Sequence, residues 1–452
     1  MQSELSFSTR DEFSRKPIAE KLINLLESDI DLSPIVINGD WGTGKTEFCL
    51  KTIQEMKGSN EKLKCVYIDT FNADSSDEPI LTLIAAIVSL FPDKEDKKSI
   101  INKAIPVIKY ASKVLLNAST TLILKENAEK LGEDLSEALK DQTATAIDAT
   151  IDNLLDTHEK STENINALRS ILESFALDSP VIVFIDELDR CRPNYALKMI
   201  ESIKHIFNIK NVKFVLVTNV NQLSSSINKL YGESINANRY LDKFIGFKIE
   251  LIEYHRKYDD KIYSNSVEYF DFLISKNKEL NFLSTFPGHK DFISFLIKVH
   301  RLSLRDIERL YKFLLVYQIT SGCEIGRHSY FLNVVYKVFG VFIYMLNEDL
   351  RDRFITGDYT CEDVFSVIGV QDYLLEEIIS SRINKTAVEI ITPLLVEANN
   401  YSNFKYRNNS LIEALEDKWN SSREHLVRGN IFFEDANAKK FVQEVMYSLM
   451  LL

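Results

Sequence analysis

The stretch Gly39-Asp40-Trp41-Gly42-Thr43-Gly44-Lys45-Thr46 decides the fold class of this 452-residue chain. It matches the pattern GxxxxGK(S/T) at every defined position. A short apolar run precedes it at residues 34–37, and a helical pattern follows in which Phe48, Ile53 and Met56 share one face. A strand, a glycine-rich loop and a helix in this order aim backbone N–H groups and the positive end of the helix at one place, where phosphate oxygens bind.

The last two residues of the motif carry specific chemistry. Lys45 supplies a point charge for the β- and γ-phosphates of a nucleotide, and the Thr46 hydroxyl is placed to ligate Mg²⁺. A glycine-rich turn without a ligand is the alternative, but the strand before the loop and the helix after it favour phosphate binding. The residues that we predict to bind the nucleotide are Gly39, Asp40, Trp41, Gly42, Thr43, Gly44, Lys45, Thr46 and Glu47.

Two carboxylates follow an apolar run at residues 181–185. Ligands of open parallel sheets bind at the carboxyl ends of the strands, where Asp186 and Glu187 are expected. We predict that Asp186 holds Mg²⁺ through water and that Glu187 orients or deprotonates the attacking water. A solvated strand end is the alternative, and the phosphate loop makes the metal site the stronger interpretation. The next residues, Asp189 and Arg190, are expected to form a structural ion pair with each other.

The alternation of apolar runs and helical patterns predicts an α/β fold. The apolar runs lie at residues 34–37, 65–68, 181–185, 214–217 and 247–251. Helical stretches separate them, the order expected of a P-loop NTPase core, a parallel β-sheet flanked by helices, at residues 10–252. A mixed-charge, proline-poor pattern predicts a helical insertion at about residues 79–179. Beyond residue 252 only helix-period segments follow, so the C-terminal region is predicted to be all-α.

The composition indicates a folded protein without a strong affinity for polyanions. Apolar residues make up 45% and charged residues 27%, close to globular averages. The formal net charge of -12 opposes a general attraction to nucleic acid. The cysteines form no CxxC pair, which predicts reduced thiols, and the N-terminus lacks the apolar run of a secretory signal. We therefore predict a cytoplasmic protein.

A membrane-spanning segment is not predicted, although peripheral contact with a membrane stays open. The apolar run at residues 80–91 is shorter than the ~20 residues that a bilayer requires. The run at residues 331–346 contains Asn333 and Lys337. A charge near a helix centre costs roughly 2.5–3.5 kcal/mol on insertion, so neither run is expected to cross a bilayer.

The residues around the acidic strand resemble a known family. The signature is Asp186-Glu187-Leu188-Asp189-Arg190-Cys191-Arg192-Pro193, with residues 196–207 and 214–249 after it. It is similar to the KAP family of P-loop NTPases, and the resemblance extends from about residue 11 to residue 313. It implies an additional-strand ATPase fold, related to AAA+ and STAND proteins and used for ATP-driven assembly. It also implies a helical lid at residues 253–320. The helix-period segments that follow predict a C-terminal helical domain at residues 321–452.

The chain departs from the family pattern at two places. Many members carry transmembrane helices inserted between the phosphate loop and the acidic strand, whereas the insertion here contains Lys109 and Lys113 in its most apolar stretch. This difference argues against membrane anchoring. The family also usually ends its fourth core strand with an acidic residue, where this chain has Thr218 and Asn219. The Asn219 amide can orient water or sense the γ-phosphate, but it cannot act as a base.

Two arginines complete the set of candidate catalytic residues. Arg305 lies in a capping pattern that opens a helix, and resemblance to the lid of related ATPases implies that it contacts the nucleotide phosphates. An ordinary solvated arginine is the alternative. Arg239 occupies the place where related ring ATPases offer an arginine finger to the neighbouring subunit, which can be worth roughly 10³ to 10⁵ in rate. A surface arginine, or one paired with Asp242, is the alternative.

These predictions lead to one function and its rivals. The leading hypothesis is a Mg²⁺-dependent ATPase whose conformation or assembly follows the γ-phosphate. ATP is favoured over GTP because no NKxD motif follows the fourth strand. The expected partners besides ATP are further copies of the chain, a protein effector, or both. A role in bacterial anti-phage defence follows only from the family resemblance. A non-hydrolysing ATP-bound scaffold is the alternative, and a small-molecule kinase is disfavoured because Asp186 and Glu187 fit water activation better.

Overall fold

The computed structural model divides the chain into two compact units, Met1–Ile252 and Glu253–Leu452. Each unit is described by itself. The described residues are 5–11, 13–59, 63–74, 79–91, 100, 165–177, 180–205, 207–232, 234–256, 262–285, 287–321, 331–368, 394–395, 417 and 438–451.

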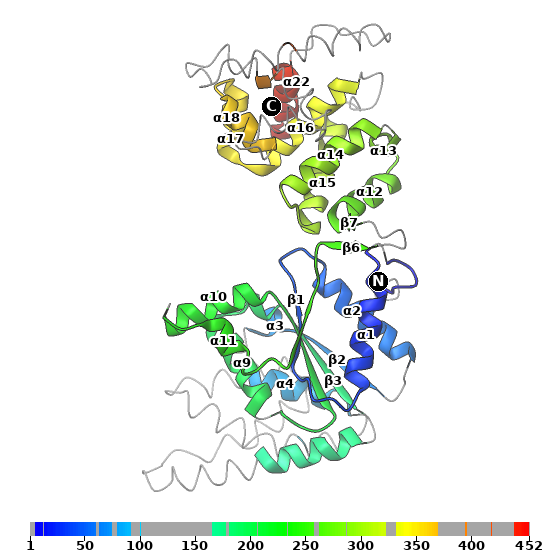
Figure 1. The fold of residues 1–452 in the computed structure, drawn as a ribbon, viewed down its shortest axis with the longest axis vertical. Coiled ribbons are helices and arrows are strands. Elements are labelled where there is room, and N and C mark those ends of the chain that lie inside the picture. Colours follow the sequence, from blue (N-terminus) through cyan, green and yellow to red (C-terminus); the bar gives the residue numbers. More distant parts are fainter. Residues whose placement is uncertain are drawn as a thin grey trace. The chain divides into compact units, whose positions relative to one another are not determined.

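A five-stranded parallel sheet forms the centre of the N-terminal unit (Figure 1). Its strands, in spatial order, are β2 (Lys64–Asp69), β3 (Val181–Asp186), β4 (Val212–Thr218), β1 (Ile35–Asn38) and β5 (Phe247–Glu250). Every residue of β3 is buried, which explains its uninterrupted apolar sequence, because a parallel sheet is covered on both faces. The predicted parallel sheet flanked by helices is therefore confirmed.

Helices cover both faces of this sheet (Figure 1). On one face lie α1 (Lys16–Glu27) and α2 (Lys45–Ser59), and on the other lie α4 (Pro79–Val88), α9 (Pro193–His205), α10 (Val220–Tyr231) and α11 (Ala237–Leu241). Successive side chains of β3 alternate between these two cores. Ile182 and Phe184 pack with α1 and α2, whereas Val183 and Ile185 pack with α9 and α10. Residues 165–177 are helical and contribute to the second core, and the rest of the predicted insertion after residue 91 lies almost entirely outside the described residues.

The C-terminal unit begins with a short antiparallel hairpin, in which β6 (Tyr254–Arg256) pairs with β7 (Ile262–Ser264). The prediction of helices alone beyond residue 252 was wrong here, because strands of three residues are too short to show an alternating pattern. Helices follow: α12 (Asn265–Lys276), α13 (Phe282–Thr285), α14 (Pro287–Val299), α15 (Leu304–Thr320), α16 (Phe331–Leu346), α17 (Glu348–Thr356), α18 (Cys361–Ile368) and α22 (Ala438–Met450).

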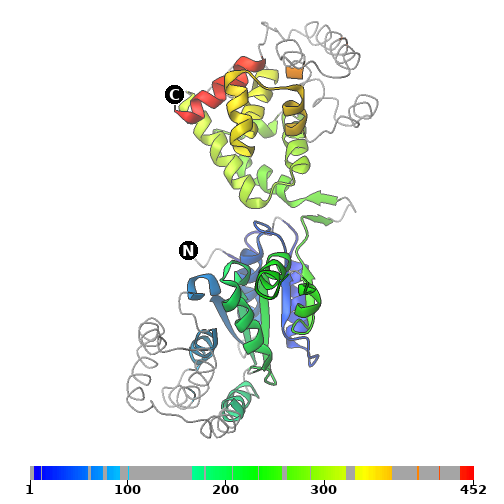
Figure 2. The same ribbon diagram turned by 90° about the vertical axis from the view of Figure 1, so that its left-hand side faces the viewer.

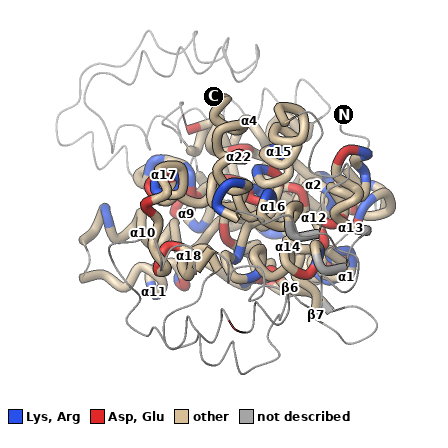
Figure 3. The backbone as a smooth tube through the Cα atoms, turned by 90° about the horizontal axis from the view of Figure 1, so that it is seen from above, with Lys and Arg blue, Asp and Glu red and all other residues tan. Residues whose placement is uncertain are grey.

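Close helix packing organises this unit (Figure 2). Helix α16 lies against α22, and a Cβ atom added at Gly340 of α16 would lie only 3.0 Å from the Cβ atom of Val445 on α22. The predicted capping pattern of α15 is present, because Ser303 and Asp306 bond reciprocally as a capping box. None of the described helices combines the length and the apolar character needed to cross a bilayer. Basic and acidic residues are interspersed along α17, as the blue and red segments of its backbone show in Figure 3.

Two glycines give a matched test of the N-terminal unit's packing. A Cβ atom added at Gly246, just before β5, would collide with the carbonyl group of Leu32, whereas one added at Gly58 in α2 would meet nothing within 4 Å. We expect Gly246→Ala to lower the free energy of unfolding by about 2 kcal/mol. Gly58→Ala should raise it by about 0.5 kcal/mol, because alanine is the better helix former.

Urea unfolding followed by circular dichroism measures both changes. Equal stability of the Gly246→Ala protein and the parent protein would show that the segment before β5 does not approach Leu32 as described.

Candidate nucleotide-binding site

The phosphate loop between β1 and α2 has a conformation that requires its glycines. Gly42 and Gly44 have φ angles of 76° and 79°, in the left-handed region that side chains disfavour. A Cβ atom at Gly39 would lie 2.8 Å from the Thr43 hydroxyl oxygen. The loop therefore folds tightly at the start of α2, and its backbone can approach a ligand closely.

Lys45 lies over the loop from which it comes. Its Nζ atom donates hydrogen bonds to the carbonyl oxygens of Gly39, at 2.6 Å, and Asp40, at 3.1 Å. Burial lowers the pKa of Lys45, and the nearby carboxylates of Asp189 and Asp186 partly oppose this effect. The ammonium group is thus partly desolvated and directed into the cradle of the loop.

Asp186 is the most deeply buried carboxylate of the site, with 1% of its surface exposed. It accepts hydrogen bonds from the Tyr67 hydroxyl at 3.0 Å and from the Glu187 backbone N–H at 2.7 Å, and the Thr46 side chain lies near enough to favour its ionised form. Burial raises the pKa of Asp186, and these hydrogen bonds and the charge of Lys45 counteract part of the rise. The contact with Thr46 brings together the two residues that the sequence predicts as metal ligands.

Glu187 follows in a left-handed backbone conformation, with a φ angle of 61°. Its carboxylate pairs with Arg190, whose Nη2 atom lies 2.8 Å from Oε1. The predicted pairing of Asp189 with Arg190 is therefore wrong. Residues 188–190 form the 3₁₀ turn η3 (Leu188–Arg190), which places Arg190 back over Glu187. Burial raises the pKa of Glu187, and the charge of Arg190 opposes the rise.

Asp189 connects two other parts of the site. Its Oδ2 atom accepts a hydrogen bond from the Trp41 indole N–H at 2.6 Å, and its Oδ1 atom accepts one from the Thr218 hydroxyl at 3.0 Å. The tip of the phosphate loop is thereby attached to η3 and to the end of β4. Sequence reasoning missed this role, and it missed the contact of Tyr67 with Asp186. For Tyr67 the available signal was its polar hydroxyl near the end of the strand beside β3.

Asn219 caps α10 and also contacts the loop. Its Oδ1 atom accepts hydrogen bonds from the backbone N–H groups of Asn221 and Gln222 at 3.0 and 3.3 Å, and its amide nitrogen donates to the Asp40 carboxylate at 3.2 Å. Because the amide oxygen serves the helix cap, the amide nitrogen is the group that faces the phosphate loop. Any sensing of phosphate by Asn219 would use that nitrogen as a donor.

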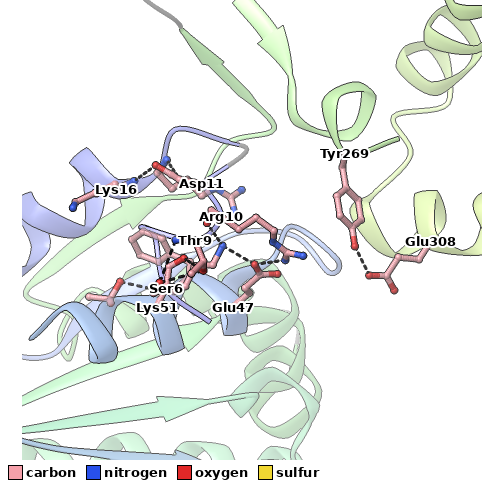
Figure 4. A network of polar contacts seen from close by, with 12 residues as sticks. Ser6, Thr9, Arg10, Asp11, Lys16, Glu47, Lys51, Tyr269 and Glu308 are labelled. Carbon is pink, nitrogen blue, oxygen red and sulfur yellow. Dashed lines mark hydrogen bonds and ion pairs between the residues drawn. The ribbon is translucent and has the colours of Figure 1, made fainter. Parts of the chain in front are cut away.

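Glu47, which the sequence assigns to nucleotide binding, directs its side chain to other partners (Figure 4). Arg10 and Lys51 both pair with this carboxylate, Lys51 at 2.8 Å, and Lys51 also donates to the Arg10 carbonyl at 2.6 Å. Burial opposes ionisation of Glu47, but the bonds from Lys51 and Arg10 outweigh it and lower its pKa. The backbone N–H of Glu47 is the group that a phosphate could use.

The two predicted arginines lie on helices that carry neither the phosphate loop nor the acidic strand. Arg239 is exposed on α11, in agreement with the alternative of a surface arginine. Within the described residues it forms no ion pair with Asp242, so the pairing with Asp242 is wrong. Arg305 is exposed as the second residue of α15, in the C-terminal unit. By contrast, Lys45, Asp186 and Asn219 are linked through the contacts of the phosphate loop.

The residues present suit a Mg²⁺–nucleotide group. Hydroxyl and carboxylate oxygens are the ligands that Mg²⁺ prefers, and Thr46 and Asp186 present both side by side. Nowhere in the described part of the chain do three or more His, Cys, Asp and Glu side chains gather as metal ligands. A magnesium ion here would therefore complete its coordination with phosphate oxygens and water, as is usual for this ion.

Comparison with known proteins agrees with this geometry. A search of curated proteins finds no match to the chain. The sequence profile of the KAP family P-loop domain matches residues 15–318, more than half of the 452 residues, and the match includes the phosphate loop, β3 and η3. The chain therefore belongs to the KAP family of P-loop NTPases.

Proposed function

We propose that this protein binds ATP with Mg²⁺ in its phosphate loop and hydrolyses it, and that the exchange of ATP for ADP changes its conformation or assembly. The observation that carries the proposal is the buried Asp186 carboxylate, which lies beside Thr46 of the loop motif and accepts a hydrogen bond from the Tyr67 hydroxyl. A buried carboxylate destabilises a fold unless donors or charges surround it. Desolvated charged groups of this kind concentrate at functional sites.

Lys45 is the group proposed to bind the β- and γ-phosphates. Its bonds to the carbonyl oxygens of Gly39 and Asp40 keep the ammonium at the loop, where phosphate oxygens would offer stronger, charge-assisted hydrogen bonds. Glycines at positions 42 and 44 allow the backbone N–H groups to face the same ligand. We propose ATP as the nucleotide because the residues after β4 lack the aspartate of a guanine-specific NKxD motif.

Thr46 and Asp186 would hold Mg²⁺, Asp186 through water. When bound, the ion neutralises charge on the phosphate oxygens. Glu187, adjacent to Asp186, is proposed to accept the proton of the attacking water, and the amide nitrogen of Asn219 is proposed to sense the γ-phosphate. In addition, Arg305 is proposed to respond to that phosphate from the C-terminal helices.

The wider role rests on family resemblance and on composition. We propose a cytoplasmic protein that assembles with further copies of itself, with a protein effector, or with both. The exposed position of Arg239 on α11 supports a role toward a neighbouring subunit. A contribution to bacterial anti-phage defence is proposed by analogy with phage-exclusion members of the family.

Two substitutions test nucleotide binding and hydrolysis separately. Lys45→Ala removes the cation of the loop, so we expect ATP affinity to fall at least about tenfold and hydrolysis to stop. Glu187→Gln keeps the loop but removes the base, so we expect ATP affinity close to that of the parent protein and a kcat roughly a hundredfold lower. Binding of a fluorescent ATP analogue and release of inorganic phosphate measure the two effects. Unchanged hydrolysis by Lys45→Ala would refute the proposal. If the parent protein binds ATP but does not hydrolyse it, the result would support the alternative of an ATP-bound scaffold.

Asp186→Asn should separate stability from function. The amide oxygen can accept from the Glu187 N–H, and the hydroxyls of Tyr67 and Thr46 can rotate to accept from the amide nitrogen, so the buried charge is removed without leaving a donor unpaired. We expect the free energy of unfolding, measured in urea with chelator present, to rise by about 1 kcal/mol, while magnesium-dependent ATP hydrolysis is lost.

Asp186→Ala serves as the control, since it leaves the Glu187 N–H and a cavity behind and should be less stable than the parent protein. If Asp186→Asn were strongly destabilised, the carboxylate would be stabilising the fold and its proposed role as a group kept for metal binding would lose its main support.

Arg239 gives a test of assembly. If it completes the site of a neighbouring subunit, specific ATPase activity should fall on dilution, and Arg239→Ala should lose at least about tenfold in kcat while binding ATP normally. Lys229→Ala, which removes another exposed cation from α10, is the control and should retain activity. Mass photometry with and without ATP follows the assembly. Specific activity that stays constant over a hundredfold dilution would contradict a shared site.

A further inference from the structure

The guanidinium group of Arg190 pairs with the carboxylate of Glu187, which is the group proposed to activate water for hydrolysis. Its Nη2 atom lies 2.8 Å from Oε1 of Glu187, and the two side chains are only 34% and 18% exposed. An Oε1 atom that accepts from a guanidinium has less capacity left to accept a hydrogen bond from a water molecule. The same pairing fixes the direction of the side chain. Glu187 therefore cannot orient a water molecule freely while this ion pair persists.

The backbone around the pair limits how Glu187 can be released. Glu187 has a φ angle of 61°, and its carbonyl oxygen accepts a hydrogen bond from the Arg190 N–H at 3.0 Å. Leu188, between them, is completely buried. Since the backbone of the turn is held in this way, rotation of the two side chains is the simplest change that separates the carboxylate from the guanidinium.

Arg190 also lies within electrostatic reach of the phosphate cradle. Its charge contributes to the lowered pKa of Lys45, although burial is the main cause. The turn that carries Arg190 is attached to the loop tip through the Asp189–Trp41 hydrogen bond. A triphosphate in the cradle would thus bring several negative charges near a guanidinium that otherwise pairs with Glu187.

From these contacts we infer that Arg190 is a positioning residue that restrains Glu187, and that a bound nucleoside triphosphate weakens this restraint only in part. This inference rests on the proposed function, because it concerns the same hydrolytic site. It assigns to Arg190 a regulatory part that is separate from metal binding by Asp186 and from phosphate binding by Lys45. The part of the restraint that remains would limit the rate at which the bound triphosphate is hydrolysed.

The test compares kcat with nucleotide affinity in three variants of the full chain. Arg190→Gln removes the charge that holds Glu187, and we expect kcat to rise roughly two- to tenfold because the restraint that persists in the ATP complex is lost. The attraction of the guanidinium to the triphosphate is lost as well, so the ATP dissociation constant should rise, by no more than about tenfold. Arg190→Lys keeps a charge but loses the planar guanidinium, and its kcat should lie between the kcat of the parent protein and that of Arg190→Gln. The matched control is Arg192→Gln, which removes a neighbouring arginine that pairs with Asp74 instead, and it should leave kcat unchanged.

A double substitution distinguishes release of Glu187 from a general effect on folding. In a Glu187→Gln background, Arg190→Gln should no longer alter kcat, because no carboxylate remains to be released. The inference is overturned if Arg190→Gln leaves kcat unchanged or lowers it, or if the increase persists without Glu187. If the proposed function itself were wrong, the binding measurement would show it, because the parent protein would then not bind ATP. A parent protein that binds ATP without hydrolysing it should gain hydrolysis from Arg190→Gln, and absence of that gain also overturns the inference.

Discussion

The candidate site depends on the burial of a single carboxylate. Asp186 ends the strand β3. It accepts hydrogen bonds from Tyr67 on β2 and from the backbone that follows it, and Thr46 on α2 lies beside it. A buried carboxylate is tolerated only where donors surround it, and the low local dielectric makes each of those bonds stronger. The positions of β2, of α2 and of the turn after β3 are therefore coupled through the same two oxygen atoms.

Several unfavourable features of the N-terminal unit lie around these atoms, although Ser14 and Asn211, which belong to other parts of the unit, also have positive φ angles, of 50° and 65°. Lys45 is partly desolvated, Glu187 adopts a backbone conformation that is costly for a residue with a side chain, and Gly42 and Gly44 provide the positive φ angles of the loop. Away from the site the sheet follows ordinary rules, with continuous apolar strands and a hydrophobic core on each face. The two cores thus stabilise a fold that retains strained and charged groups where a ligand would use them.

The sequence predicted what depends on local patterns and missed what depends on side-chain direction. Glycine spacing identified the phosphate loop, and continuous apolar runs identified the strands, because both signals are contained in a few consecutive residues. The partner of Arg190 was not predictable in this way. Side chains at i and i+1 point apart, whereas those at i and i+3 of a 3₁₀ turn lie above one another, so Arg190 meets Glu187 rather than Asp189 once η3 forms. The cap formed by Asn219 likewise depends on where α10 begins.

Because η3 is so short, three parts of the site share one small element. Asp189 attaches it to the loop tip through Trp41 and to the end of β4 through Thr218, while the next residue holds the carboxylate of Glu187. A shift of the loop tip must therefore move η3 or break the bond between Trp41 and Asp189. Since the buried Leu188 anchors the turn in the core, breaking the bond between Trp41 and Asp189 requires less rearrangement than moving η3. Communication between the loop and the acidic strand would then consist of exchanges between side-chain partners, with the sheet itself remaining rigid.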